Sequence, residues 1–88
     1  MSKWNYTFDI KDDWKKAEND EISAKQLSNI VVEKIKSSAF YSKNKEDLND
    51  IIWDFEEIRE HDSFDDFDTI WSDFYDWADE NRVWVAIC

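Results

Sequence analysis

The sequence contains no glycine, no proline, one cysteine and one histidine in 88 residues. Without glycine it lacks phosphate-binding loops, dinucleotide fingerprints, EF-hand loops and nucleophile elbows, because each needs glycine at a fixed position. The single cysteine, Cys88, excludes an intramolecular disulfide, which fits a reducing compartment. The N-terminal residues contain no apolar stretch of signal-peptide length, and no segment has the length of a membrane span. We therefore expect a cytoplasmic protein.

The residues that usually carry catalysis are also scarce. The one histidine, His61, falls where a helix is expected to end, and Cys88 ends a β-prone run, so no nucleophile–histidine pair is predicted. Glu57 and His61 are four residues apart, and aspartates follow them, but the segment lacks the glycine of a calcium-binding loop. We expect no enzymatic activity, no cofactor and no dedicated metal site.

Aromatic and charged residues are abundant instead. Hydrophobic residues make up 42% of the chain, with six tryptophans and six phenylalanines, which is too apolar for a disordered acidic tail. The length suits one domain, residues 1–88. Residues 1–44 carry eight lysines and seven acids, whereas residues 45–88 carry three basic residues and fifteen acids, a net charge of −12. We expect a near-neutral scaffold half followed by an acidic helical half with a C-terminal strand.

The hydrophobic pattern predicts an α+β fold. Alternating residues at 4–10 and an apolar run at 83–88 predict two strands, the second covered on both faces. A short helical turn capped by Asp12 and Asp13 follows the first strand. Three main helices are predicted at about 23–38, 45–60 and 64–80, the first from a Ser23–Gln26 capping box and the last from a Ser63 cap. We expect these helices to pack on a two-stranded sheet formed by the N- and C-terminal strands.

The last two predicted helices each carry seven acids opposite an apolar face. Most charge runs are solvated surfaces, and that interpretation remains open here. However, like charges three or four residues apart cost a helix about 0.2–0.5 kcal/mol per pair, and few lysines offset them. Acids four residues apart repeat every ~6 Å along a helix, so such rows can offer a basic groove a charge pattern like that of a nucleic-acid backbone.

Trp53 interrupts the acidic side of the helix predicted at about 45–60. It either packs against the last helix or a strand, or serves as an aromatic anchor within a charged rim, as interface hot spots do. The predicted partner-binding residues are therefore this tryptophan and the neighbouring acids: Asp50, Trp53, Asp54, Glu57, Asp65, Asp66, Asp68, Asp73, Asp76, Asp79 and Glu80.

Two resemblances bear on function. The aromatic-acidic segment Phe67-Asp68-Thr69-Ile70-Trp71-Ser72-Asp73-Phe74-Tyr75-Asp76-Trp77-Ala78-Asp79 resembles, in character, the small phage and mobile-element inhibitors that mimic DNA, including anti-CRISPR and anti-restriction proteins. The segment from Tyr41 to Trp53 resembles a Tyr-Gly-Asn-Leu-Asp-Leu-Trp region of the barstar ribonuclease inhibitors, without its glycine. In both families, acids occupy a site that is meant for phosphates.

These resemblances imply an inhibitor that blocks the basic groove of a CRISPR effector, a restriction enzyme or a nuclease, in a host bacterial cytoplasm if a phage encodes it. It would not bind nucleic acid or a membrane itself. The alternatives are a homodimeric assembly protein whose acids only solvate the surface, and a barstar-like nuclease inhibitor.

Overall fold

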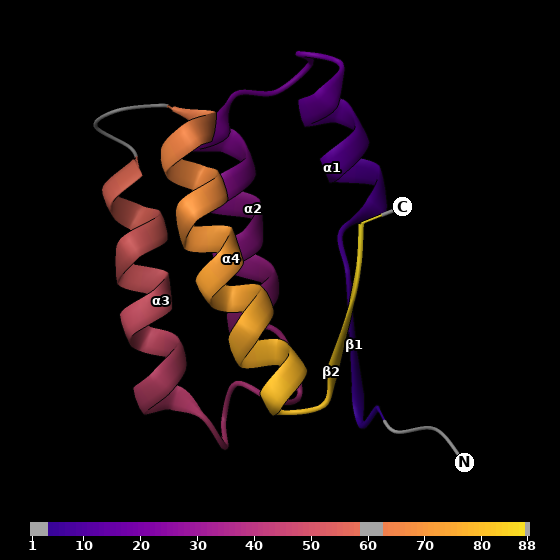
Figure 1. Ribbon diagram of the computed structural model, residues 1–88, viewed down its shortest axis with the longest axis vertical. Helices are drawn as coiled ribbons and strands as arrows, with labels where there is room; N and C mark the ends of the chain where they lie inside the picture. Colours follow the sequence, from indigo (N-terminus) through magenta and orange to yellow (C-terminus); the bar gives the residue numbers. More distant parts are fainter. Residues whose placement is uncertain (1–3, 59–62, 88) are drawn as a thin grey trace.

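A computed structural model of the protein describes residues 4–58 and 63–87. Three of its four helices pack against one another and form the helix layer, and the two strands run along one side of that layer with the remaining helix above them (Figure 1). The elements follow one another as β1 (Tyr6–Asp9), α1 (Lys11–Glu18), α2 (Ala24–Lys36), α3 (Lys45–Glu57), α4 (Phe64–Glu80) and β2 (Val83–Ala86). The fold class is therefore α+β, as predicted.

The predicted number of helices is wrong. The helical turn that was expected after the first strand is an eight-residue helix, α1, so the described chain has four helices rather than three main ones. Asp12 and Asp13 do not cap it, because α1 already begins at Lys11 and both aspartates lie in its first turn, at the positive end of the helix dipole.

Local capping sets the starts of α2 and α4 as predicted. Ser23 and Gln26 form a complete capping box, in which each side chain accepts a hydrogen bond from the other residue's backbone N–H. The Ser63 hydroxyl accepts from the Asp66 N–H at 3.5 Å, so α4 begins at the expected Phe64. α2 ends at Lys36, two residues before the expected Ser38.

Two backbone positions show how a chain without glycine ends its helices. Asp20 follows α1 and Arg82 follows α4, both with left-handed φ angles, of 60° and 59° respectively. The Asp20 N–H donates to the Ala17 carbonyl and the Arg82 N–H to the Asp79 carbonyl, the pattern in which glycine usually occupies this position. Each residue accepts a left-handed conformation that costs roughly 1–2 kcal/mol relative to the right-handed one.

The two strands are parallel and pair in the register Tyr6↔Val83 to Asp9↔Ala86. Their arrangement differs from the prediction: both strands are shorter than the expected ranges 4–10 and 83–88. Cys88, the last residue of the second range, lies outside the described residues. The expectation that the second strand is covered on both faces is also wrong: Val83 is 2% exposed, whereas Trp84 is 48% exposed. The helices cover one face of the sheet, and on the other Trp84 contacts Trp4 with ring centroids 5.3 Å apart.

Aromatic rings join the sheet to the helix layer. Phe8 of β1 lies with its ring centroid 5.0 Å from that of Phe74 and 6.4 Å from that of Phe40. On α4, Trp71 lies next to Phe67 and to Phe74, with centroid distances of 5.8 and 5.4 Å. This core leaves the opposite sides of α3 and α4 to the solvent, and those sides carry the acids.

Candidate functional site

The acidic side of α3 faces the acidic side of α4 across a shallow groove. The two helices run antiparallel next to each other (Figure 1). A hollow of about 340 Å³ between them is lined by Asp54, Glu57, Ile58, Asp66, Thr69 and Ile70. Asp50 lies one turn before Asp54 on α3, and Asp73 lies two turns after Asp66 on α4. We call Asp50, Asp54, Glu57, Asp66 and Asp73 the acidic groove.

Asp54 is the most strongly perturbed member of the acidic groove. It lies between Ile51 and Ile58 at the edge of the apolar face of α3 and is half-buried. Burial raises the pKa of its carboxyl above the ordinary 3.8, and the charges of Glu57, Asp73 and Asp50 raise it further. The folded chain therefore holds a carboxylate where both its solvation and its neighbours oppose ionisation.

This perturbation predicts a stability effect of known sign. With the folded pKa above the unfolded 3.8, the folded protein binds more protons between the two values, so the free energy of unfolding falls as the pH rises through that window. Asp54→Asn should raise that free energy at pH 7 by about 0.5–1 kcal/mol, since it removes like-charge pairs with Asp50 and Glu57 worth ~0.2–0.5 kcal/mol each.

Urea denaturation of the wild type and of Asp54→Asn, at neutral pH and at a pH below 3.8, measures this effect. The gain should disappear at the lower pH, where Asp54 is protonated in both states. An equal gain at both pH values would mean that the asparagine packs better and that charge is not the cause.

Trp53 lies exposed beside the acidic groove, not in the core. Its side chain is 66% exposed, and its indole Nε1–H donates to Glu57 Oε1 at 2.9 Å. The alternative in which Trp53 packs against the last helix or a strand is therefore wrong. The hydrogen bond fixes the ring beside a groove carboxylate, where it offers a flat apolar surface within a charged rim.

The structure separates the predicted acids of α4 into two surfaces. Asp66, Asp73 and Glu80 are spaced seven residues apart and form the stripe nearer α3, on which Glu80 lies beyond the groove. The remaining acids lie on the other flank of α4, which we call the outer flank: Asp65, Asp68, Asp76 and Asp79. All four are exposed, and so is Tyr75 at 49%, although the helical pattern placed that tyrosine on the apolar side.

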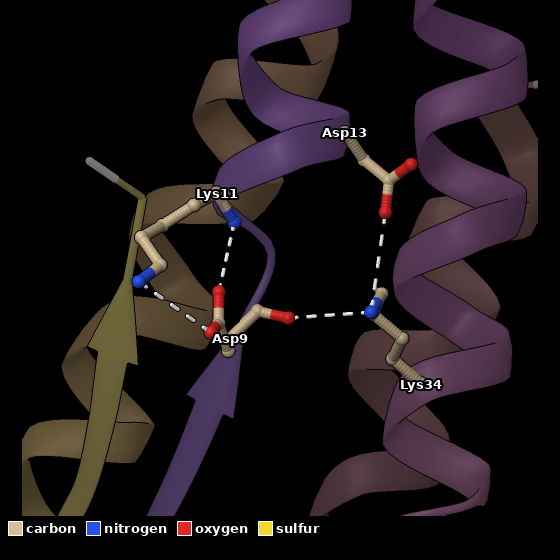
Figure 2. Close-up of polar contacts among 4 residues, drawn as sticks. All are labelled: Asp9, Lys11, Asp13 and Lys34. Atoms are coloured by element: carbon tan, nitrogen blue, oxygen red, sulfur yellow. Dashed lines mark hydrogen bonds and ion pairs between the residues drawn. The ribbon is translucent and has the colours of Figure 1, made fainter.

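The two halves of the chain differ in how their charges are paired. Lys11 pairs with Asp9 at 3.7 Å, and Lys34 pairs with Asp13 at 3.9 Å while also donating to the Asp9 backbone carbonyl at 3.2 Å (Figure 2). Within residues 4–58 and 63–87, no carboxylate of α3 or α4 forms an ion pair. The acidic half thus keeps its negative charge available for another molecule.

In the described part of the chain, no three side chains of histidine, cysteine, aspartate or glutamate come together so as to hold a metal ion. His61, the candidate partner of Glu57, lies outside the described residues.

Comparison of the chain with protein-family models, with curated proteins and with solved structures found no match. No helix among the described residues combines the length and the apolar character needed to cross a membrane.

The partial burial of Asp54 does have a signal in the sequence. Asp54 occurs three residues after one isoleucine and four residues before another, which is the spacing of a residue at the margin of an apolar face. The division of the α4 acids into two surfaces depends on which flank of α4 packs beside α3, and no single-helix pattern contains that information.

Proposed function

We propose that this protein binds the basic nucleic-acid-binding groove of another protein and blocks it by presenting carboxylates in place of phosphates. In this it would act as anti-CRISPR and anti-restriction inhibitors do. A nuclease, as bound by barstar-like inhibitors, is the other partner class that fits the same chemistry. The acidic groove is the proposed centre of contact, with Trp53 as its aromatic anchor.

The half-buried carboxylate of Asp54 carries this proposal. A side chain at the edge of an apolar face is more stable when it is uncharged, and here three further acids oppose its ionisation. Folding gives no reason to keep a charge at this position. Binding of a cationic partner would give such a reason, because each lysine or arginine of the partner would relieve the repulsion among these acids.

The unpaired state of the acids supports the same conclusion. Groups that serve only to keep a surface solvated are usually interspersed with the opposite charge. In this chain two lysines of the first half, Lys11 and Lys34, pair with acids of that same half. A concentrated negative surface accelerates encounter with a positive one, and that attraction weakens as salt is added.

Capture from a bacterial lysate tests the proposal. The full chain is immobilised, loaded at low salt, and eluted either with duplex DNA at constant ionic strength or with a salt gradient. We expect nucleic-acid-binding proteins to be retained, to be released by the DNA, and to lose DNA binding in a gel-shift assay when free protein is added. Retention that DNA does not reverse would show that the acids do not occupy a nucleic-acid site.

Two tryptophan variants give this experiment a matched control. Trp53→Ala should weaken retention about 30-fold, since hot-spot truncations cost ~2 kcal/mol or more. Trp84→Ala removes a comparably exposed tryptophan, 48% against 66%, from the open face of the sheet, far in the sequence from the acidic groove. An equal loss of retention in the two variants would show that Trp53 is not part of the contact surface.

One observation favours the alternative of a homodimer. Among the described residues the sheet has two strands, and Trp84 lies on its open face, where a second copy could pair or pack. Two strongly acidic copies repel each other, so a dimer would strengthen with added salt while capture of a basic partner weakens. Light scattering across a salt series separates the two functions.

A further inference from the structure

A second hollow lies on the other side of α4, away from the acidic groove. It has a volume of about 210 Å³ and opens where α1, α2 and the first turns of α4 meet. Its apolar walls are formed by Trp14, Ala17, Leu27, Phe64 and Phe67. The ring centroids of Trp14, from α1, and Phe67, from α4, lie 5.9 Å apart, and the small side chain of Ala17 lines the cavity one turn after Trp14 on α1.

Carboxylates surround this aromatic cavity. Glu18 from α1, Asp20 from the turn after it and Asp68 from α4 complete the lining, which contains no lysine or arginine among the residues that the structure describes. The Asp20 backbone is held in its left-handed conformation by two hydrogen bonds that close the end of α1, from Asp20 N–H to the Ala17 carbonyl and from Glu21 N–H to the Lys16 carbonyl. The acids at this rim therefore come from two segments that are far apart in the sequence, the end of α1 with the turn after it and the start of α4.

We infer that the aromatic cavity receives one arginine side chain of a basic protein. A methylene stem fits against apolar walls, and a planar guanidinium stacks on aromatic faces and donates to carboxylates at the same time. A metal ion would leave the rings unused, and a neutral apolar side chain would leave the rim unused. With a water molecule occupying about 30 Å³, the cavity has room for one long side chain and not for a folded segment.

The inference deepens the proposed function, and it rests on that function for the protein that carries the arginine. Asp68 belongs both to the cavity rim and to the outer flank of α4. The cavity therefore gives the outer flank a specific contact, whereas the acidic groove meets the partner mainly through charge. An arginine in the cavity and a basic surface across the groove would hold α4 from both sides.

Small probes test the cavity without any partner. N-acetyl-arginine amide is titrated into the full chain while the indole N–H signals are followed by two-dimensional NMR, with Trp14 assigned from a Trp14→Phe variant. We expect a saturable shift of the Trp14 signal. N-acetyl-citrulline amide, which has nearly the same shape without the charge, should bind at least ten-fold more weakly, and N-acetyl-lysine amide at least five-fold more weakly. Equal binding of all three probes would overturn the inference.

Variants locate the binding. Asp68→Asn should weaken the arginine probe about five-fold or more, whereas Asp76→Asn, which makes the same charge change on the same helix outside the cavity lining, should leave it within two-fold. Ala17→Leu should fill the space and abolish the saturable shift, with the remaining indole signals as the check on folding. Equal effects of the two aspartate variants would show that the probe follows bulk charge, and the inference would then be wrong.

The probe titration and the lysate capture together distinguish a failure of this inference from a failure of the proposed function. If the arginine probe does not bind but the wild type still captures nucleic-acid-binding proteins that DNA releases, only the cavity assignment fails. If the probe binds as expected but nothing is captured and released by DNA, the proposed function fails and the cavity remains an arginine site.

Discussion

Replacing Asp50, Asp66 and Asp73 together by lysine is expected to abolish binding of the basic partner. Close charge pairs at protein interfaces contribute ~1.5 kcal/mol or more each, so the loss of three corresponds to a factor of roughly 10³ in affinity. The new lysines would also repel the partner's own cations. The measurement is the dissociation constant of the captured partner, determined at fixed ionic strength by surface plasmon resonance.

This variant has an unusual internal check. Lysines at positions 50 and 73 would lie close to Asp54 and would replace two of the charges that now raise its pKa. The folded protein should therefore be at least as stable as the wild type in urea denaturation. Lost binding together with unchanged or increased stability cannot be attributed to unfolding.

A variant of equal charge provides the control. Asp65→Lys, Asp76→Lys and Asp79→Lys together change the net charge by the same amount on the outer flank of α4. Binding should then fall by only about ten-fold, mainly through the weaker long-range attraction, because none of the three positions lines the acidic groove or the aromatic cavity. If both triple variants lose the same affinity, the acidic groove is not the centre of contact and charge acts without a specific surface.

Local signals in the sequence were sufficient for α4. Its cap at Ser63, its apolar stripe and its acidic first turn all agree, and its predicted bounds match the structure. The exposure of Phe64 and Tyr75 was not predictable from the same pattern, because a helical wheel shows which residues share a side but not how wide a stripe the neighbouring elements cover.

For the strands and α1, local signals in the sequence were not sufficient. The apolar run of β2 indicated a strand covered on both faces, but in the described part of the chain the helices cover only one face, so Trp84 remains exposed. α1 was underestimated at its start, because Asp12 and Asp13 were expected to cap it, whereas the helix already begins at Lys11 and both aspartates lie in its first turn.

Some features of the candidate site were predictable from the sequence, and others were not. The identity of the acids and the unusual place of Trp53 were evident from composition and periodicity alone. The pairing of α3 with α4, the half-burial of Asp54 and the aromatic cavity all depend on contacts between separate helices. Such contacts carry no local signature, and the cavity in particular needs α1, α2 and α4 at once.

Phe74→Ala should be the most destabilising single truncation at the junction of the sheet and the helices. Removing a buried phenylalanine costs about 3–5 kcal/mol, and a chain of this length has a total stability of roughly 4–13 kcal/mol. Phe74 is 0% exposed, and its ring centroid lies 5.0 Å from that of Phe8 and 5.4 Å from that of Trp71. Urea denaturation followed by tryptophan fluorescence measures the loss, and Tyr75→Ala, which truncates the neighbouring exposed ring, should cost less than about 1 kcal/mol.

The expected size of this effect follows from the architecture. A sheet of two short strands is marginal on its own and is stable only while its inner face is packed. Phe8 supplies much of that face, and Phe74 is its nearest aromatic neighbour on α4, so truncating Phe74 opens a cavity between the two layers. A cost below about 1 kcal/mol would show that the layers hold together without this contact. The sheet would then be held mainly by Trp71 and Phe40, whose ring centroids lie 6.3 and 6.4 Å from that of Phe8.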